Sequence, residues 1–261
     1  MRKVLLYFAL KYQGDYKKIL SAITEKEQPD LNELKEVESK INCKYVTLLD
    51  KEYPQYFKNI GTPPFILFYY GDISLLNASN KIAVIGCRKN SLYGEEMTNK
   101  IIKEFKKEKC VCVSGLAEGI DGIAHRCALN NNIKTIAVLG SGIDYCYPSI
   151  NIDIYNQIKE KGLIISEYPN KSKPLPHYFL IRNRLIAAIS EHICVIEANY
   201  KSGTMNTVAY GLEYGKDICC VPSLANNNSG CNKLIKEGAK LVENLNDILE
   251  GWLWKLLNIR I

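Results

Sequence analysis

The chain has 261 residues, of which 47% are hydrophobic and 24% are charged. This length exceeds that of a typical single domain but is short for two large ones, so we expect one main domain with an appendage. The net charge of +6, from 34 basic and 28 acidic side chains, is only mildly basic. It fits a localised site for an anionic ligand better than a basic surface over the whole protein. No apolar run approaches the roughly 20 residues that span a bilayer, and no secretory signal opens the chain, so a cytoplasmic protein without membrane contact is expected.

Residues 1–75 are predicted to form a small helical module and a docking segment. Val4, Leu5 and Phe8 recur at helical spacing near the start, which is typical of an amphipathic helix. The stretch 62–71 begins with two prolines after a threonine and continues as an apolar run that ends at a glycine. Such a proline-stiffened, glycine-bounded run predicts a short strand, which we expect to dock the module onto the main body.

Residues 76–245 alternate between apolar runs and amphipathic stretches. The apolar runs are 82–85, 111–113, 135–139, 163–165, 193–196 and 218–221. Runs that are apolar on both faces and separated by helices predict parallel strands in a sheet covered on each side. The expected fold class is therefore α/β, a Rossmann-like, doubly wound and mostly parallel sheet with helices on both faces, preceded by the small helical N-terminal module.

The cysteines are interpreted as small buried hydrophobes in the reduced state. Several of the ten lie inside apolar runs, as Cys110, Cys112 and Cys194 do. A chain of this length does not need disulfides to fold, and the paired Cys-x-x-Cys spacing of a zinc site is missing. We therefore predict neither a metal nor another cofactor.

Glycines and small hydroxyl residues follow consecutive predicted strands. In open parallel sheets, ligands bind at the carboxyl ends of the strands, so these loops are expected to carry the function. The loops are 86–91, 114–121, 140–144, 167–169, 197–204 and 222–223. Glycine lets a ligand approach backbone N–H groups, which suits phosphate oxygens. Each loop alone is equally well an ordinary turn, but the set predicts a phosphate-binding edge.

Arg182-Asn183-Arg184 is the most informative motif of this edge. It precedes the apolar stretch 185–189, and we place it at the start of a helix. The loop Ser202-Gly203-Thr204 offers backbone N–H groups at the start of another helix. Guanidinium groups and helix N-termini are both phosphate receptors, so Arg182, Arg184 and also Arg88 are expected to contact phosphates.

Gly140-Ser141-Gly142 invites a different interpretation, as part of a dinucleotide-binding fingerprint. That fingerprint requires a third glycine where this chain has Tyr145, whose side chain obstructs close packing of the helix. The motif also follows the third apolar run of the main body instead of the first. NAD or FAD binding is therefore not predicted.

Several motifs occur in a fixed order between Val84 and Val242. They are Gly86-Cys87-Arg88, Ser114 to Asp121, Ala124-His125, Tyr147 to Asn151, Arg182 to Arg184, Ser202 to Thr204, and Gly230 to Ile235. In this order they closely resemble the DNA-processing protein A family, also called DprA or Smf. The resemblance implies a Rossmann-like domain that binds and protects single-stranded DNA without making or breaking a bond. It also implies loading of a RecA-type recombinase during natural transformation, and a homodimer.

The residues expected to bind DNA combine this resemblance with the loop analysis. They are Gly86, Arg88, Ser91, Ser114, Gly115, Gly140, Ser141, Gly142, Tyr147, Asn151, Phe179, Arg182, Asn183, Arg184, Ser202, Gly203 and Thr204. The aromatic rings of Tyr145, Tyr147, Tyr178 and Phe179 offer faces for unpaired bases, although packing at the rim of the crevice accounts for them equally well.

The chain departs from the family pattern at a few positions. Cys87 replaces a small hydroxyl residue, Ser149 stands where some members have lysine, and Ser223 stands where glycine is common. Residues 246–261 are expected to be a short helical tail, so the winged-helix domain found at the end of many members is expected to be absent. Recombinase loading is therefore implied less strongly than DNA binding.

Two rival functions remain open. The first is a lysine-decarboxylase-like phosphoribohydrolase, whose loop has an acidic residue where this chain has Thr207. A threonine hydroxyl cannot replace a general acid at neutral pH. The second is a sensor of small nucleotides, which would use the same crevice. A strand binder gains affinity with oligonucleotide length and loses it with salt, whereas a sensor saturates with a mononucleotide.

Asp121 and His125 lie four residues apart and share one face of a predicted helix. We interpret them as a structural pair, in which Asp121 caps the helix and His125 hydrogen-bonds nearby backbone. His177 and His192 have no partner at the spacing of metal ligands.

Overall fold

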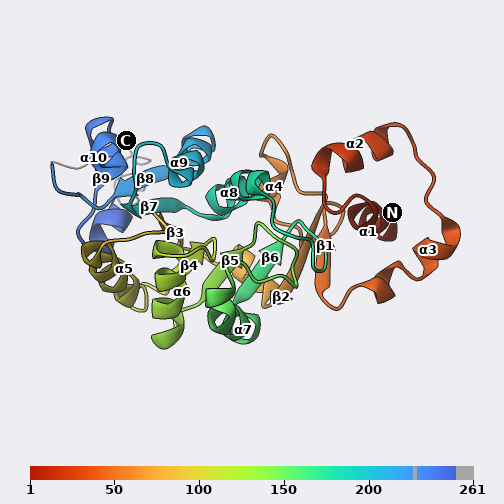
Figure 1. Ribbon diagram of the computed structural model, residues 1–261, viewed down its shortest axis with the longest axis horizontal. Coiled ribbons are helices and arrows are strands. Elements are labelled where there is room, and N and C mark those ends of the chain that lie inside the picture. Colours follow the sequence, from red (N-terminus) through yellow and green to blue (C-terminus); the bar gives the residue numbers. More distant parts are fainter. Residues whose placement is uncertain (226–227, 251–261) are drawn as a thin grey trace, which may run out of the picture.

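The computed structural model describes residues 1–225 and 228–250 and is built around one sheet (Figure 1). The nine strands lie in the order β1-β2-β6-β5-β4-β3-β7-β8-β9. Their bounds are β1 (Lys44–Thr47), β2 (Ile66–Gly71), β3 (Lys81–Gly86), β4 (Val111–Ser114), β5 (Thr135–Val138), β6 (Leu163–Ser166), β7 (His192–Glu197), β8 (Asp217–Cys220) and β9 (Lys240–Leu241). The pairs β1–β2 and β2–β6 are antiparallel, and all other neighbours are parallel. All six predicted runs form strands of this sheet, which confirms the mostly parallel α/β fold.

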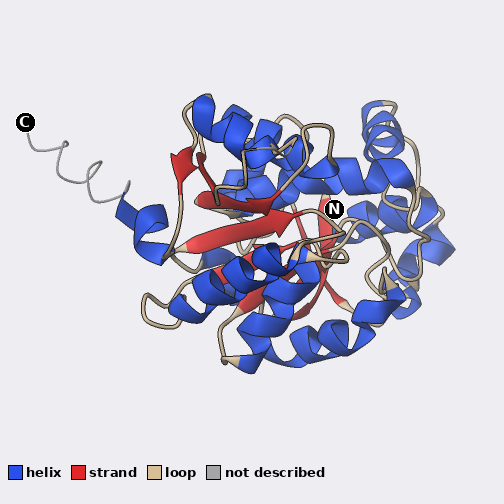
Figure 2. Cartoon of the chain, turned by 60° about the vertical axis from the view of Figure 1, so that its left-hand side comes forward, coloured by secondary structure: helices blue, strands red, loops and turns tan. Residues whose placement is uncertain are grey.

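Helices cover both faces of the sheet (Figure 2). Their bounds are α1 (Arg2–Lys11), α2 (Tyr16–Thr24), α3 (Leu31–Lys35), α4 (Gln55–Lys58), α5 (Leu92–Glu104), α6 (Ile120–Asn130), α7 (Ile152–Lys161), α8 (Pro176–Ile189), α9 (Gly203–Glu213) and α10 (Gly230–Lys236), with 3-10 turns η1 (Val37–Lys40), η2 (Ile73–Asn77) and η3 (Ser149–Asn151). Successive residues of a strand point to opposite faces. Along β3, Ala83 and Ile85 therefore pack in the core that includes α8 and α9, whereas Ile82 and Val84 pack in the core that includes α5 and α6.

The N-terminal segment contains the predicted helices but also joins the sheet. Helices α1, α2 and α3 lie beyond the end of the sheet where β1 lies, with α10 and β9 toward the opposite end (Figure 1). The docking segment forms β2, which pairs with β6. Strand β1 was not predicted, because its four residues, of which the first is an exposed lysine, are too few to show a period. An independent domain over residues 1–75 stays a prediction.

The order of the strands creates one switch point. From β3 the chain builds outward through β4, β5 and β6, and then crosses to β7 on the other side of β3. At such a point the connections leave neighbouring strands in opposite directions and open a crevice at their carboxyl ends. The crevice between β3 and β7 is thus the place where the fold favours a ligand.

The cysteines and the tail complete the core. All ten cysteines are free thiols, and the seven buried ones serve as packing residues. Ile248 is buried and Leu249 packs against the same core, whereas Trp252 and Leu256 of the expected helical tail lie outside the described residues. Among the residues described, no helix is long and apolar enough to cross a membrane.

Candidate functional site

A cavity of about 530 Å³ lies at the carboxyl ends of β3 and β7. Its walls come from the loops after β3 and β4, from α8, and from the start of α9. Nine of the predicted contact residues line it: Gly86, Arg88, Tyr147, Phe179, Arg182, Asn183, Ser202, Gly203 and Thr204. A smaller cavity of about 70 Å³ shares Arg88, Tyr147 and Phe179 with it and adds Gly115. The structure therefore gathers much of the predicted set around one hollow.

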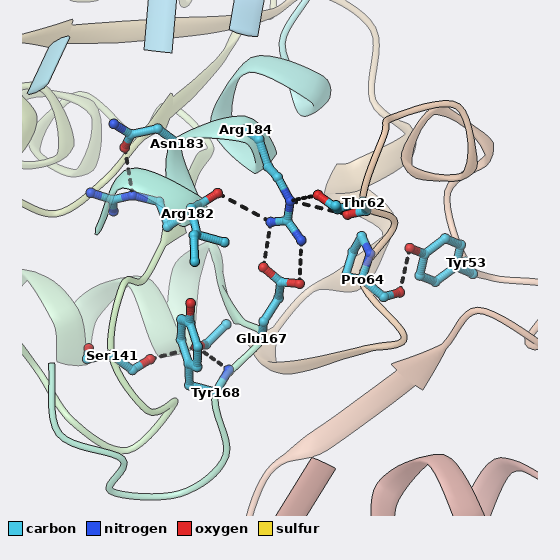
Figure 3. Close-up of polar contacts among 11 residues, drawn as sticks. Tyr53, Thr62, Pro64, Ser141, Glu167, Tyr168, Arg182, Asn183 and Arg184 are labelled. Atoms are coloured by element: carbon cyan, nitrogen blue, oxygen red, sulfur yellow. Dashed lines mark hydrogen bonds and ion pairs between the residues drawn. The ribbon is translucent and has the colours of Figure 1, made fainter. Parts of the chain in front are cut away.

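Arg182 is a fixed cation in the wall of this cavity. Its Nη1 donates to the carbonyl oxygen of Gly115 at 2.6 Å and to that of Val138, and its Nε donates to Oδ1 of Asn183 at 3.1 Å (Figure 3). Burial lowers the pKa of Arg182 to about 10, although the nearby carboxylate of Asp121 opposes the shift. The guanidinium therefore stays positive at neutral pH.

The motif Arg182-Asn183-Arg184 does not begin a helix, as the sequence analysis proposed. Helix α8 begins at Pro176 and carries the motif in its interior. A proline is favoured at the first position of a helix because it has no N–H group to leave unpaired. Arg182 therefore reaches the cavity from the interior of the helix, while Pro176 at the start of α8 and Gly203 at the start of α9 also line the cavity.

Gly115 lies between Asp121 and Arg182. Its N–H donates to Oδ2 of Asp121 at 3.1 Å, while its carbonyl oxygen accepts from Arg182. A Cβ atom at this position would lie 2.4 Å from Nη1 of Arg182, so only glycine fits. Asp121 also lines the cavity, and burial raises its pKa, although Arg182 opposes the shift.

The expected role of Asp121 needs correction. The N-cap of α6 is Gly119, and Asp121 lies within the first turn, where it accepts from Gly115 instead of capping the helix. His125 Nδ1 contacts the side-chain Oγ1 of Thr135 at 2.7 Å. Both residues are buried, so the structural interpretation fits, although Asp121 does not cap the helix.

The start of α9 faces the same cavity. Gly203 and Thr204 line it, and no side chain among the described residues caps the helix at Ser202. The first N–H groups of a helix lack intrahelical acceptors and carry partial positive charge. Asn183 Nδ2 donates to the carbonyl of Gly203 at 3.2 Å, which ties this helix start to the residue next to Arg182.

The rim combines an exposed cation with aromatic rings. Arg88 is exposed, and its guanidinium carbon lies 5.7 Å from the centroid of the Phe179 ring. The rings of Phe179 and Tyr147 lie 5.5 Å apart and are tilted by 42°. Tyr178 instead stacks on Tyr168 at 3.9 Å.

Arg184 lies outside the cavity. Its side chain is 2% exposed, and its two Nη atoms each donate to the carboxylate of Glu167 at 2.6 Å (Figure 3). Its Nε donates to Oγ1 of Thr62 at 2.8 Å. With its donors engaged and its surface covered, Arg184 has no place in a phosphate-binding surface, and we drop it from the set of contacts.

The predicted polar residues that do not line the cavity make hydrogen bonds that stabilise the fold. Ser91 caps α5 and donates from Oγ to Glu197 at 3.0 Å. Ser114 and Asn151 are buried and donate to backbone carbonyls. Ser141 is also buried, and its Oγ donates to the carbonyl of Tyr145 at 2.7 Å.

The two glycines of the third loop are needed for close packing. A Cβ on Gly140 would lie 2.7 Å from the ring of Phe179, and one on Gly142 would lie 2.2 Å from the carbonyl oxygen of Asn170. The N–H of Gly142 donates to the carbonyl of Ser172. The segment around Asn170 therefore covers Gly142, whose N–H group is engaged there.

Apolar residues of α8 were missing from the predicted site. Leu180 and Ile186 line the cavity together with Asn183. Their spacing of three residues places them on one side of a helix. A helix start placed at Pro176 would have revealed this pattern in the sequence.

The comparison with protein families decides the identity of the chain. The family model for DNA recombination-mediator protein A matches residues 44–253. The chain belongs to this family. DNA processing protein DprA of Streptococcus pneumoniae is 40% identical over 205 residues, which cover 78% of this chain and 72% of that protein. DprA of Bacillus subtilis is 36% identical over 207 residues, covering 78% and 70%.

Solved structures of DprA proteins have the same fold. The crystal structure of DprA from Streptococcus pneumoniae matches with a TM-score of 0.79 at 33% identity, over 94% of this chain and 95% of that one. DprA from Helicobacter pylori, whose structure was described for a unique single-stranded DNA binding mode, matches with a TM-score of 0.72 at 32% identity, over 84% and 98%. The family predicted from the ordered motifs is thereby confirmed.

Proposed function

We propose that this chain binds single-stranded DNA and places a backbone phosphate in the cavity between β3 and β7. Arg88, Arg182 and the start of α9 converge there, and this convergence carries the proposal. Guanidinium groups and helix N-termini position phosphates without reading the base sequence. The Helicobacter pylori relative, described as a binder of single strands, supports the same ligand.

Unpaired bases next to that phosphate are proposed to stack at the rim. Phe179 and Tyr147 present aromatic rings beside Arg88. Stacking contributes about 1 to 3 kcal/mol per base and requires bases free of a partner strand. The proposed ligand is therefore a single strand and not a duplex.

We propose that the strand is bound without chemical change. Asp121 is the carboxylate among the described residues that line the cavity, and it is held by the N–H of Gly115. Thr207, at the position of the acidic residue in phosphoribohydrolases, also lines the cavity, and its hydroxyl is no general acid. A sensor of small nucleotides remains the rival that binding measurements must exclude.

Three further proposals rest on membership of the family. The chain is proposed to load a RecA-type recombinase onto the bound strand, to act as a homodimer, and to work in the cytoplasm during natural transformation.

A gel-shift series with oligonucleotides of one length tests the proposal. Single-stranded oligo-dT is expected to shift at a lower protein concentration than the duplex of equal length. Equal affinity for both forms would contradict the stacking at Phe179 and Tyr147, and no shift with either would contradict DNA binding.

A further inference from the structure

An exposed aromatic ring lies just beyond the cavity, in the loop after β7. Tyr200 is 45% exposed, and it stands two residues before Ser202, which lines the cavity. Two residues of extended chain span at most about 7 Å, so the backbone of Tyr200 lies beside the cavity wall. Close to half of the residue is open to solvent, which makes its ring available to a ligand that leaves the cavity on this side.

Tyr200 is held against α10. The Nζ atom of Lys233 lies 4.9 Å from the centroid of the tyrosine ring, which is a cation–π contact. The loop itself is tied to the start of the same helix, because the N–H of Gly230 donates to the carbonyl of Ala198 at 2.7 Å. A ring that is already placed loses little conformational entropy when a ligand packs against it.

Positive charge surrounds this ring. Lys201 follows Tyr200 directly and is exposed, and the side chain of Lys233 is 44% exposed. Glu237 offsets part of the charge of Lys233, since the two side chains form an exposed ion pair at 3.6 Å. Such a pair is weak, so both lysines remain able to attract the phosphates of a strand.

The sheet places Tyr200 and the aromatic pair of the rim on opposite sides of the cavity. Tyr147 follows β5, and the ring of Phe179 lies close to Gly140, in the loop after the same strand. Tyr200 follows β7 and contacts α10, which follows β8. Strands β5 and β8 lie on opposite sides of the β3–β7 pair. A strand of DNA that runs along the carboxyl ends of the β-strands therefore passes Phe179, then the cavity, then Tyr200.

We propose that Tyr200 is a second stacking site, so that the DNA strand crosses the cavity with a stacked base on each side of the bound phosphate. The inference rests on the proposed binding of single-stranded DNA. It names the path of the strand, from the rim at Phe179 across the start of α9 to α10. It also gives a reason why a strand binds more tightly than a mononucleotide, which reaches only one of the two stacking sites.

Two ligands with equal backbone charge test the proposal. They are an oligo-dT of about twelve nucleotides and an abasic strand of the same length, which keeps the phosphates but has no base to stack. Tyr200→Ala is expected to weaken the binding of oligo-dT by about five- to a hundredfold, the usual effect of removing one stacking ring. The same variant should bind the abasic strand as tightly as the unaltered protein does. Fluorescence anisotropy at low salt measures both affinities.

Tyr200→Phe is the conservative variant that separates the ring from its hydroxyl. It should restore the affinity for oligo-dT that Tyr200→Ala loses. If Tyr200→Ala binds oligo-dT as tightly as Tyr200→Phe does, the proposal is overturned. An equal loss of affinity for oligo-dT and for the abasic strand also overturns it, because the ring then supports the loop and does not contact a base.

The unaltered protein separates this inference from the proposed function. If it fails to bind oligo-dT, the proposed function is wrong. If it binds oligo-dT and Tyr200→Ala binds equally well, DNA binding stands and the second stacking site is wrong.

Discussion

Arg184 donates two hydrogen bonds, each 2.6 Å long, to the carboxylate of Glu167, and this buried pair does not line the cavity. A further bond reaches Thr62, just before β2. The pair therefore connects α8, the loop after β6 and the segment that leads into β2. Arg182, two residues earlier, supplies a cation in the wall of the cavity. One motif therefore contains a residue that stabilises the fold and a residue that lines the site.

Arg184→Ala is expected to lower the free energy of unfolding by about 3 to 5 kcal/mol, because it leaves the buried charge of Glu167 without a partner. Urea denaturation measures this loss. The matched control is Arg126→Ala, which breaks a pair with Asp153 whose side chains are 51% and 47% exposed. Exposed pairs contribute about 0 to 1 kcal/mol. Equal losses in the two variants would contradict the structural role of Arg184.

Arg88→Ala should weaken binding to oligo-dT, because the exposed guanidinium at the rim loses its contact with phosphate. The slope of log affinity against log salt should also fall by about 1, as for the loss of one phosphate contact. Fluorescence anisotropy at several salt concentrations measures both quantities. Lys103→Ala removes an exposed cation from α5, on the other face of the sheet, and should change neither. A loss shared by both variants would point to net charge instead of a defined contact.

Gly115→Ala is expected to reduce DNA affinity at least as strongly as Arg88→Ala. The added Cβ would lie 2.4 Å from Nη1 of Arg182, so the guanidinium must move from its place in the cavity wall. Gly61→Ala is the control, because a Cβ there meets nothing within 4 Å. Normal affinity in a folded Gly115→Ala protein would show that the position of Arg182 is unimportant.

The stability of the protein should fall in mild acid through His125. Burial lowers the pKa of His125 to about 3 from an ordinary value of 6.5. Between these two values the unfolded chain binds a proton that the folded chain does not, so the free energy of unfolding decreases as pH falls, by up to about 1.4 kcal/mol per pH unit. Urea denaturation from pH 7 to pH 5 measures the slope. His125→Gln should flatten it, and an unchanged slope would rule out His125 as its source.

The sheet was predictable because its evidence is local. Six strands appear as short apolar runs with amphipathic helices between them, and that pattern fixes a parallel sheet. Strand β1 has four residues and depends on pairing with β2, so local sequence does not reveal it. Tertiary pairing decides such short strands.

The site was predictable in its location but not in every residue. Loops at strand ends pointed to the crevice, and Arg88 and Arg182 do line it. The sequence could not show that Arg182 lines the cavity while Arg184 does not, because both residues are arginines. Only the buried position of Glu167 determines that Arg184 is the one that forms the ion pair. The same applies to Gly142, whose loop is covered by the segment around Asn170.

Binding of oligo-dT of increasing length, measured at two salt concentrations, tests the central claim most directly. A strand held by Arg88, Arg182 and the start of α9 should bind more tightly as the oligonucleotide grows from one to about twelve nucleotides, and more weakly as salt rises. An affinity for a mononucleotide that equals the affinity for the longest oligonucleotide, and that does not change with salt, would contradict the account.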